Sequence, residues 1–146
     1  HVFFKDRYYG YDDAIYAGCR LIEIVAKNKA KNPNFKLTDL LEPFTKVHLS
    51  DEVRLKCPNE FKKDVLEKLK TLINDDLFNS KIKDIITIDG LRIIFNDGFA
   101  LIRQSNTEPV FTLRFEAKTK EQCENYKNTL VNLTNELVEQ KSAQKV

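Results

Sequence analysis

The 146-residue chain can form one ordinary domain, or one small domain together with part of another. Its formal net charge is only +2 and its acidic and basic residues are interspersed, which argues against a polybasic nucleic-acid arm or a membrane-binding patch. No apolar run approaches the roughly 20 residues of a membrane span. We therefore expect neither nucleic acid nor a membrane as a partner.

The cysteine pattern indicates the cellular compartment of the chain, and the absence of methionine indicates that it is a piece of a longer protein. Cys19, Cys57 and Cys123 are widely spaced, and none belongs to a Cys-x-x-Cys pair. This pattern argues against zinc or a disulfide framework and indicates a cytoplasmic protein. The chain contains no Met and opens on the apolar run "HVFF". We interpret it as an excised or processed piece of a longer protein, with a natural chain whose start was trimmed as the alternative.

The N-terminal part predicts a strand and two helices. Val2–Phe4 has the apolar character of a short strand. Residues 12–28 predict a helix capped by one of its first two aspartates, with an apolar stripe at helical spacing formed by Ile15, Gly18, Leu21, Ile22 and Val25. The stretch "KLTDLLEPF" (36–44) predicts a short second helix that its proline ends.

The segment 35–58 predicts a connection between two units. Its second half, "TKVHLSDEVRLKCP", alternates only weakly between apolar and polar residues, so we interpret it as extended chain. We place the boundary near Phe44, which gives one unit of residues 1–43 and a second of residues 44–146.

The second unit opens with a predicted helix over residues 60–77, capped by Asn59, whose apolar face contains Phe61, Val65, Leu69, Leu72 and Ile73. Its lysines Lys62, Lys63, Lys68 and Lys70 alternate with acidic residues. We interpret them as a solvated helix face.

Four apolar runs of strand length follow: 85–88, 91–95, 99–103 and 110–117. Asp89-Gly90 and Asn96-Asp97-Gly98 predict hairpin turns between the first three. In the last run every second residue is apolar, so one face of the sheet is buried. Thr119 begins a capping box, and the helix after it presents the stripe Cys123, Tyr126, Leu130, Leu133 and Leu137. The predicted fold class is α+β, a four-stranded mainly antiparallel sheet with helices on one face.

The stretch "RQSNTEP" (103–109) between the last two strands carries the main candidate site. Arg103 offers a forked cation, Ser105 and Thr107 offer hydroxyls, and Asn106 offers an amide, which together suit a phosphate. Ser, Asn and Thr are also ordinary turn formers, so spacing alone leaves a purely structural turn as the alternative.

Other candidate sites are weaker. His48 lies in the extended connection and is interpreted as a surface residue. The aromatic loop "FFKDRYYGY" is interpreted as packing, not as a sugar platform. No Ser-His-Asp arrangement, metal-ligand cluster or P-loop is visible, so nothing here predicts covalent catalysis by the chain alone.

Two stretches together resemble the α-D-phosphohexomutases (phosphomannomutase/phosphoglucomutase). "HVFFKDRYYGYDDAIYAGCRLIEIVA" resembles the end of that family's third domain, and "DGLRIIFNDGFALIRQSNTEPVFTLRFEA" resembles its fourth, C-terminal domain. The resemblance implies a TATA-box-binding-protein-like fold for residues 44–146. It implies that residues 1–43 are a strand–helix remnant of an α/β sugar-binding domain with a linker helix.

The resemblance also implies site residues. Arg103, Ser105, Asn106 and Thr107 would bind the non-reacting phosphate of a hexose phosphate, and His1 would end the sugar-selecting loop. The family's phosphoserine and its Mg²⁺-binding loop have no counterpart here. We therefore expect no catalytic or metal residue in this chain.

The implied parent enzyme interconverts hexose 1- and 6-phosphates of mannose, glucose or both. It works through a 1,6-bisphosphate, uses Mg²⁺ held elsewhere, and needs its other domains. Our alternative hypothesis is a free-standing, non-catalytic α+β module that binds protein or nucleic acid on its sheet.

Overall fold

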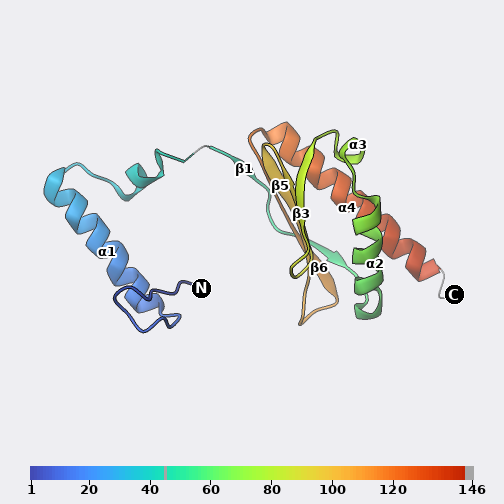
Figure 1. The fold of residues 1–146 in the computed structure, drawn as a ribbon, viewed down its shortest axis with the longest axis horizontal. Helices are drawn as coiled ribbons and strands as arrows, with labels where there is room; N and C mark the ends of the chain where they lie inside the picture. Colours follow the sequence, from blue (N-terminus) through green and yellow to red (C-terminus); the bar gives the residue numbers. More distant parts are fainter. Residues whose placement is uncertain (45, 144–146) are drawn as a thin grey trace. The chain divides into compact units, whose positions relative to one another are not determined.

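The computed structural model describes residues 1–44 and 46–143, and the contacts within it divide the chain into two compact units (Figure 1). The first unit is His1–Thr45 and the second is Lys46–Val146. Among the described residues, no helix is both long and apolar enough to cross a bilayer.

The first unit contains α1 (Ala14–Lys31) and the 3₁₀ helix η1 (Leu37–Leu41). The predicted aspartate cap is confirmed, because the backbone N–H of Tyr16 donates to the Asp13 carboxylate at 2.9 Å. The strand expected at the start is reduced to one isolated bridge between Phe3 and Asp12. The assignment of this unit to a third domain stays a prediction.

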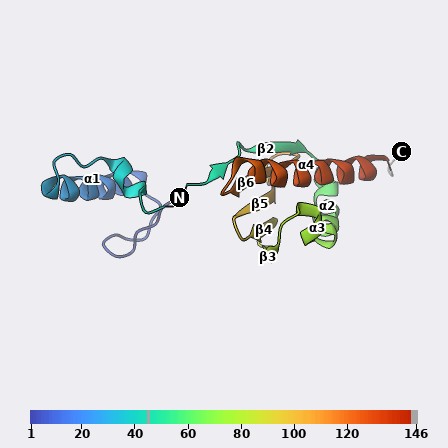
Figure 2. The same cartoon turned by 90° about the horizontal axis from the view of Figure 1, so that it is seen from above.

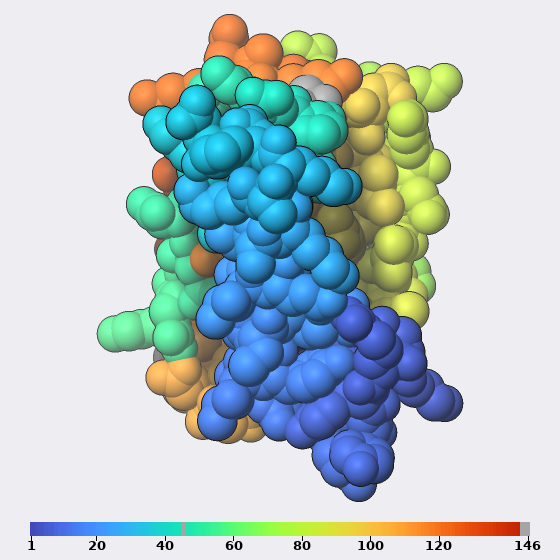
Figure 3. All heavy atoms as spheres, turned by 90° about the vertical axis from the view of Figure 1, so that its left-hand side faces the viewer, coloured from blue at the N-terminus to red at the C-terminus, as the bar shows by residue number. Residues whose placement is uncertain are grey.

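The apolar stripe of α1 is not covered within the first unit. The helix has no buried residue, and the side chains of Ile15 and Ile22 are 82% and 69% exposed. Figure 3 shows the surface of this unit in blue. An amphipathic helix gains most of its stability by burying such a face, so α1 needs a further packing partner.

The second unit is a six-stranded antiparallel sheet with helices on one face (Figures 1 and 2). The strands are β1 (His48–Leu49), β2 (Val53–Lys56), β3 (Ile82–Ile86), β4 (Leu91–Phe95), β5 (Gly98–Gln104) and β6 (Val110–Ala117). The helices are α2 (Asn59–Leu72), α3 (Asp75–Phe78) and α4 (Lys120–Ala143). The predicted α+β class is confirmed.

The core lies between the sheet and these helices. From β6, the side chains of Phe111, Leu113, Phe115 and Ala117 are all fully buried, as the alternation predicts. From α4, the buried side chains are Cys123, Tyr126, Leu130, Thr134 and Leu137. Four of these five belong to the predicted stripe, so α4 packs on the sheet by the face that its sequence indicates.

The structure adds two strands to the four that were predicted. β1 and β2 both pair with β6 along the edge that β5 leaves free, and both come from the segment interpreted as a connection. Between them Ser50 continues the pairing, because its N–H donates to Phe115 O at 3.0 Å and its hydroxyl accepts from Phe115 N at 3.1 Å. Residues 48–56 are therefore part of the domain and not a free linker.

The helix predicted over residues 60–77 is wrong in two details. It stops at Leu72, and Asn74 then caps the separate helix α3 by accepting from Leu77 N at 2.9 Å. Asn59 is the first helical residue of α2 and makes no cap, since Pro58 occupies the cap position without a side-chain bond. A proline before the first turn costs no helical hydrogen bond.

Candidate functional site: the β5–β6 loop

The loop between β5 and β6, residues 105–109, lies where α2 begins. The backbone N–H of Cys57, just before α2, donates to Pro109 O at 2.8 Å. Residues Asp89 and Gly90, in the β3–β4 turn, both have positive φ values of 58° and 121°. This turn places the Asp89 carboxylate beside Arg103 at the end of β5.

Arg103 is held in place but keeps donors to spare. Its Nε donates to the Asp89 carboxylate at 2.9 Å, and its Nη2 bonds the same oxygen. Both side chains are about half exposed. A guanidinium has five N–H groups, so three remain for a ligand. Asp89 therefore orients the guanidinium of Arg103 and leaves three of its N–H groups available to a ligand.

Ser105 organises the interior of the loop. Its own N–H donates to Val110 O at 3.0 Å, which closes the loop. Its Oγ accepts from Glu108 N at 3.1 Å and from Thr107 N at 3.4 Å. A hydroxyl has two acceptor positions and one proton, so Ser105 can give its O–H proton either to Thr107 Oγ1, 3.4 Å away, or to a ligand in its place.

Asn106 and Thr107 are the exposed tip. Thr107 Oγ1 lies 3.4 Å from Ser105 Oγ, so the two hydroxyls are adjacent. In the described part of the chain, neither the backbone N–H nor the side-chain amide of Asn106 has a hydrogen-bond partner. The tip thus presents two hydroxyls and unused amide donors to solvent beside Arg103.

The loop is held by hydrogen bonds and an ion pair from residues that were not predicted as site residues. Lys62 of α2 donates to Ser105 O at 2.7 Å and to Glu108 O at 2.6 Å. Its side chain is only 4% exposed, which corrects the interpretation of Lys62 as part of a solvated face. On the other side, Arg54 of β2 forms an ion pair with the Glu108 carboxylate.

Of the residues predicted to bind ligand, the structure brings Arg103, Ser105, Asn106 and Thr107 together on one loop. It places His1 in the first unit, where the His1 ring bonds the Asp12 carboxylate. Among residues 1–44 and 46–143, no group of three or more His, Cys, Asp or Glu side chains could hold a metal ion.

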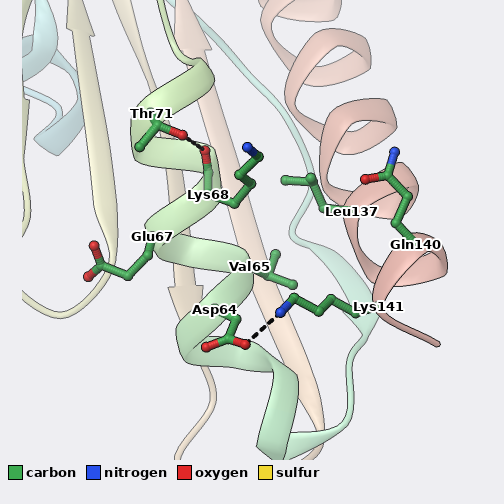
Figure 4. A pocket seen from close by; sticks show the side chains of 8 residues that line it. All are labelled: Asp64, Val65, Glu67, Lys68, Thr71, Leu137, Gln140 and Lys141. Atoms are coloured by element: carbon green, nitrogen blue, oxygen red, sulfur yellow. Dashed lines mark hydrogen bonds and ion pairs between the residues drawn. The ribbon is translucent and has the colours of Figure 1, made fainter. Parts of the chain in front are cut away.

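A hollow with a volume of about 550 Å³ lies between α2 and α4 (Figure 4). Lys141 reaches across it to the Asp64 carboxylate at 2.7 Å, and this ammonium lowers the pKa of Asp64. None of the predicted site residues lines it. The cation that bridges the groove is already paired with a carboxylate.

The family of the chain follows from comparison with known proteins. Residues 52–133 match the family model described as phosphoglucomutase/phosphomannomutase, C-terminal domain. The chain belongs to the phosphoglucomutase/phosphomannomutase family. The match covers every strand from β2 to β6 and the loop between β5 and β6.

Individual relatives support this family assignment. A phosphoglucomutase of Neisseria gonorrhoeae is 40% identical over 129 residues, which are 88% of this chain and 26% of that protein. A phosphomannomutase/phosphoglucomutase of Pseudomonas syringae is 36% identical over 124 residues, 85% of this chain and 24% of that protein. A solved structure of a family protein from Burkholderia thailandensis has a TM-score of 0.73 at 34% identity, over 94% of this chain and 26% of that one. The chain spans about a quarter of the length of these relatives.

Sequence reasoning missed Lys62 and the role of Asp89. One signal for Lys62 was present, since it precedes Val65 by three residues and Leu69 by seven, and both are fully buried. That spacing puts all three on the core face of one helix. The Asp89–Arg103 pair had no such signal, because a carboxylate in an Asp-Gly turn is explained by the turn itself.

Proposed function

We propose that this chain supplies the phosphate-binding, C-terminal part of a phosphohexomutase, an enzyme that interconverts hexose 1- and 6-phosphates through a bisphosphate. The sugar is glucose, mannose or both. The loop Arg103–Thr107 binds the phosphate that is not reacting, and the chain alone has no turnover. The observation that carries the proposal is the group of donors that Arg103, Ser105 and Asn106 can offer a ligand from one braced loop.

These donors suit a phosphate and are indifferent to the sugar. A phosphate dianion accepts several short bonds, and a guanidinium gives it two parallel ones. Substrate must turn over between the two half-reactions of such an enzyme, so the distal site receives the 1-phosphate in one and the 6-phosphate in the other. Hydroxyls, amides and one arginine recognise the anion in both cases.

A lid role for residues 46–146 is part of the same proposal. Such a lid would move about the connection between the two compact units. The connection predicted over residues 35–58 is shorter in the structure, because β1 and β2 already belong to the sheet. The uncovered stripe of α1 supports the expectation that the first unit packs against further domains of the parent enzyme. Mg²⁺ and the phosphoserine would be held there.

The alternative of a nucleic-acid module receives less support. Stacking needs accessible aromatic rings on the open face of the sheet. Phe99 lies on that face, opposite Glu116, but the guanidinium of Arg92 covers its ring at 4.3 Å. A salt-dependent gel shift with RNA or DNA would favour this alternative.

The proposal is tested by nuclear magnetic resonance of the 146-residue chain. Glucose 6-phosphate and mannose 6-phosphate should shift the backbone amide signals of Ser105, Asn106 and Thr107, and unphosphorylated glucose should not. Arg103→Lys replaces the forked guanidinium by a single ammonium group. It should raise the dissociation constant of the sugar phosphate about tenfold, which corresponds to the loss of one hydrogen bond to a charged group. Arg114→Lys, on the exposed strand face, is the control and should bind as the wild type does. Shifts confined to residues outside the loop would contradict the proposal.

A further inference from the structure

Lys62 is the one buried charged side chain in the described part of the second unit. It projects from the first turns of α2 and donates to two carbonyl oxygens of the β5–β6 loop, those of Ser105 and Glu108. Both bonds are short, at 2.7 and 2.6 Å, as expected for a charged donor. A residue 43 positions away in sequence therefore holds the loop at both of its ends.

These two bonds determine which way the loop's peptide groups face. In a planar trans peptide, the C=O of one residue and the N–H of the next point in opposite directions. Since Ser105 O points inward to Lys62, the N–H of Asn106 points away from α2. This is the N–H that has no partner among the described residues. At the other end the following residue is Pro109, which has no N–H to place.

The Lys62 ammonium also places a positive charge on the α2 side of the loop. Its two partners are neutral carbonyls, which solvate the charge but do not cancel it. A charge that is almost fully removed from water is costly unless an opposite charge balances it. A dianion bound on the outer side of the loop supplies that opposite charge.

We propose that Lys62 is the positioning residue of the phosphate loop: it fixes the Ser105 and Glu108 carbonyls inward, turns Asn106 N–H outward as a ligand donor, and favours a bound phosphate through its charge. This inference rests on the proposed function of the loop. Lys62 does not touch the ligand, and its effect passes through the loop backbone and its charge.

The test compares three variants of the 146-residue chain, with glucose 6-phosphate as the ligand. Lys62→Met keeps the length of the side chain and removes both the donors and the charge. Lys62→Gln keeps an N–H donor without the charge. Lys63→Met is the matched control, because it removes the same charge from the exposed neighbouring position on α2.

We expect Lys62→Met to raise the dissociation constant about tenfold or more and to shift the Asn106 amide signal before any ligand is added. Lys62→Gln should restore the ligand-free Asn106 signal in large part but recover only part of the affinity. Lys63→Met should change neither. A Lys62→Met variant with wild-type affinity and an unmoved Asn106 signal would overturn the inference.

The outcome separates this inference from the proposed function. If the wild type fails to bind glucose 6-phosphate, the proposed function falls, and the ligand-free Asn106 signal still reports whether Lys62 positions the loop. If Lys62→Met does not fold, the inference is tested on the wild-type chain, by recording the ¹⁵N signal of the Lys62 ammonium. That signal should be protected from solvent exchange and move on adding ligand, and a fast-exchanging signal that stays in place contradicts the inference.

Discussion

Replacing Tyr126 by Phe should destabilise the second unit by about 2–3 kcal/mol at pH 7. Tyr126 is fully buried on α4, and its ring stacks on Phe95 with centroids 4.0 Å apart. Its hydroxyl donates to Asp97 at 2.8 Å and lies 2.9 Å from Ser80 Oγ. Phe keeps the stacking and removes both hydrogen bonds.

The magnitude follows from these two bonds. The bond to the Asp97 carboxylate involves a charged group and contributes roughly 1.5–3 kcal/mol, and the neutral one to Ser80 contributes about 1 kcal/mol. The favourable hydration that the Tyr126 hydroxyl loses on folding reduces their sum. Equilibrium unfolding in urea, followed by circular dichroism, should show a midpoint lowered by roughly 1–2 M. The same deletion at Tyr9, which is 81% exposed, is the control and should change stability by less than about 0.5 kcal/mol.

The penalty should also depend on pH. Burial raises the pKa of Tyr126 to about 12 in the folded chain, with the Asp97 carboxylate adding to the effect. In the unfolded chain a tyrosine titrates near pH 10. The folded state thus holds the proton more tightly, so this stabilisation is complete below pH 10 and is lost as the pH rises through about 12. The loss amounts to roughly 2–3 kcal/mol.

Comparing wild type with Tyr126→Phe at each pH removes the contribution of the lysines, which titrate in both. The difference between the two should shrink from pH 9.5 to pH 12. A penalty below about 0.5 kcal/mol at pH 7, or one that stays constant up to pH 12, would refute the hydrogen-bonding role assigned to Tyr126.

Two further predictions concern close packing and thiol exposure. Gly98→Ala should destabilise the second unit by about 2–3 kcal/mol in urea unfolding, because a Cβ there would lie 1.9 Å from the backbone oxygen of Glu116; wild-type stability would contradict this register of β5 on β6. A disulfide reagent at pH 8 should rapidly label one thiol, that of exposed Cys19, and label Cys57 and Cys123 only after unfolding, since burial excludes the reagent and raises the pKa of both thiols. Three equally fast thiols in the folded chain would count against the buried positions.

The elements with strong periodicity were predictable from sequence. The runs 91–95 and 110–117 became β4 and β6 with the same bounds, because period-two burial and flanking turns leave little choice. β1 and β2 were not predictable in this way. They have only two and four residues, too few for an alternating pattern to be distinctive. They form strands because β6 has an edge that needs partners for its N–H and C=O groups.

The candidate site was predictable in its donors but not in its support. Arg103, Ser105, Asn106 and Thr107 are adjacent in sequence, so their chemistry can be read directly. Lys62 is distant, and lysine is the side chain least expected in a core. Its burial depends on two carbonyls that only the folded loop presents. Long-range bonds between a side chain and a backbone carbonyl carry no local pattern.

The position of a bound phosphate tests the central claim most directly. A crystal structure of the 146-residue chain with glucose 6-phosphate should show phosphate oxygens about 3 Å from Ser105 Oγ, from Asn106 N and from the Arg103 guanidinium. The sugar ring should extend into solvent. A phosphate bound instead beside Lys141 in the groove between α2 and α4, with the loop unchanged, would contradict the account.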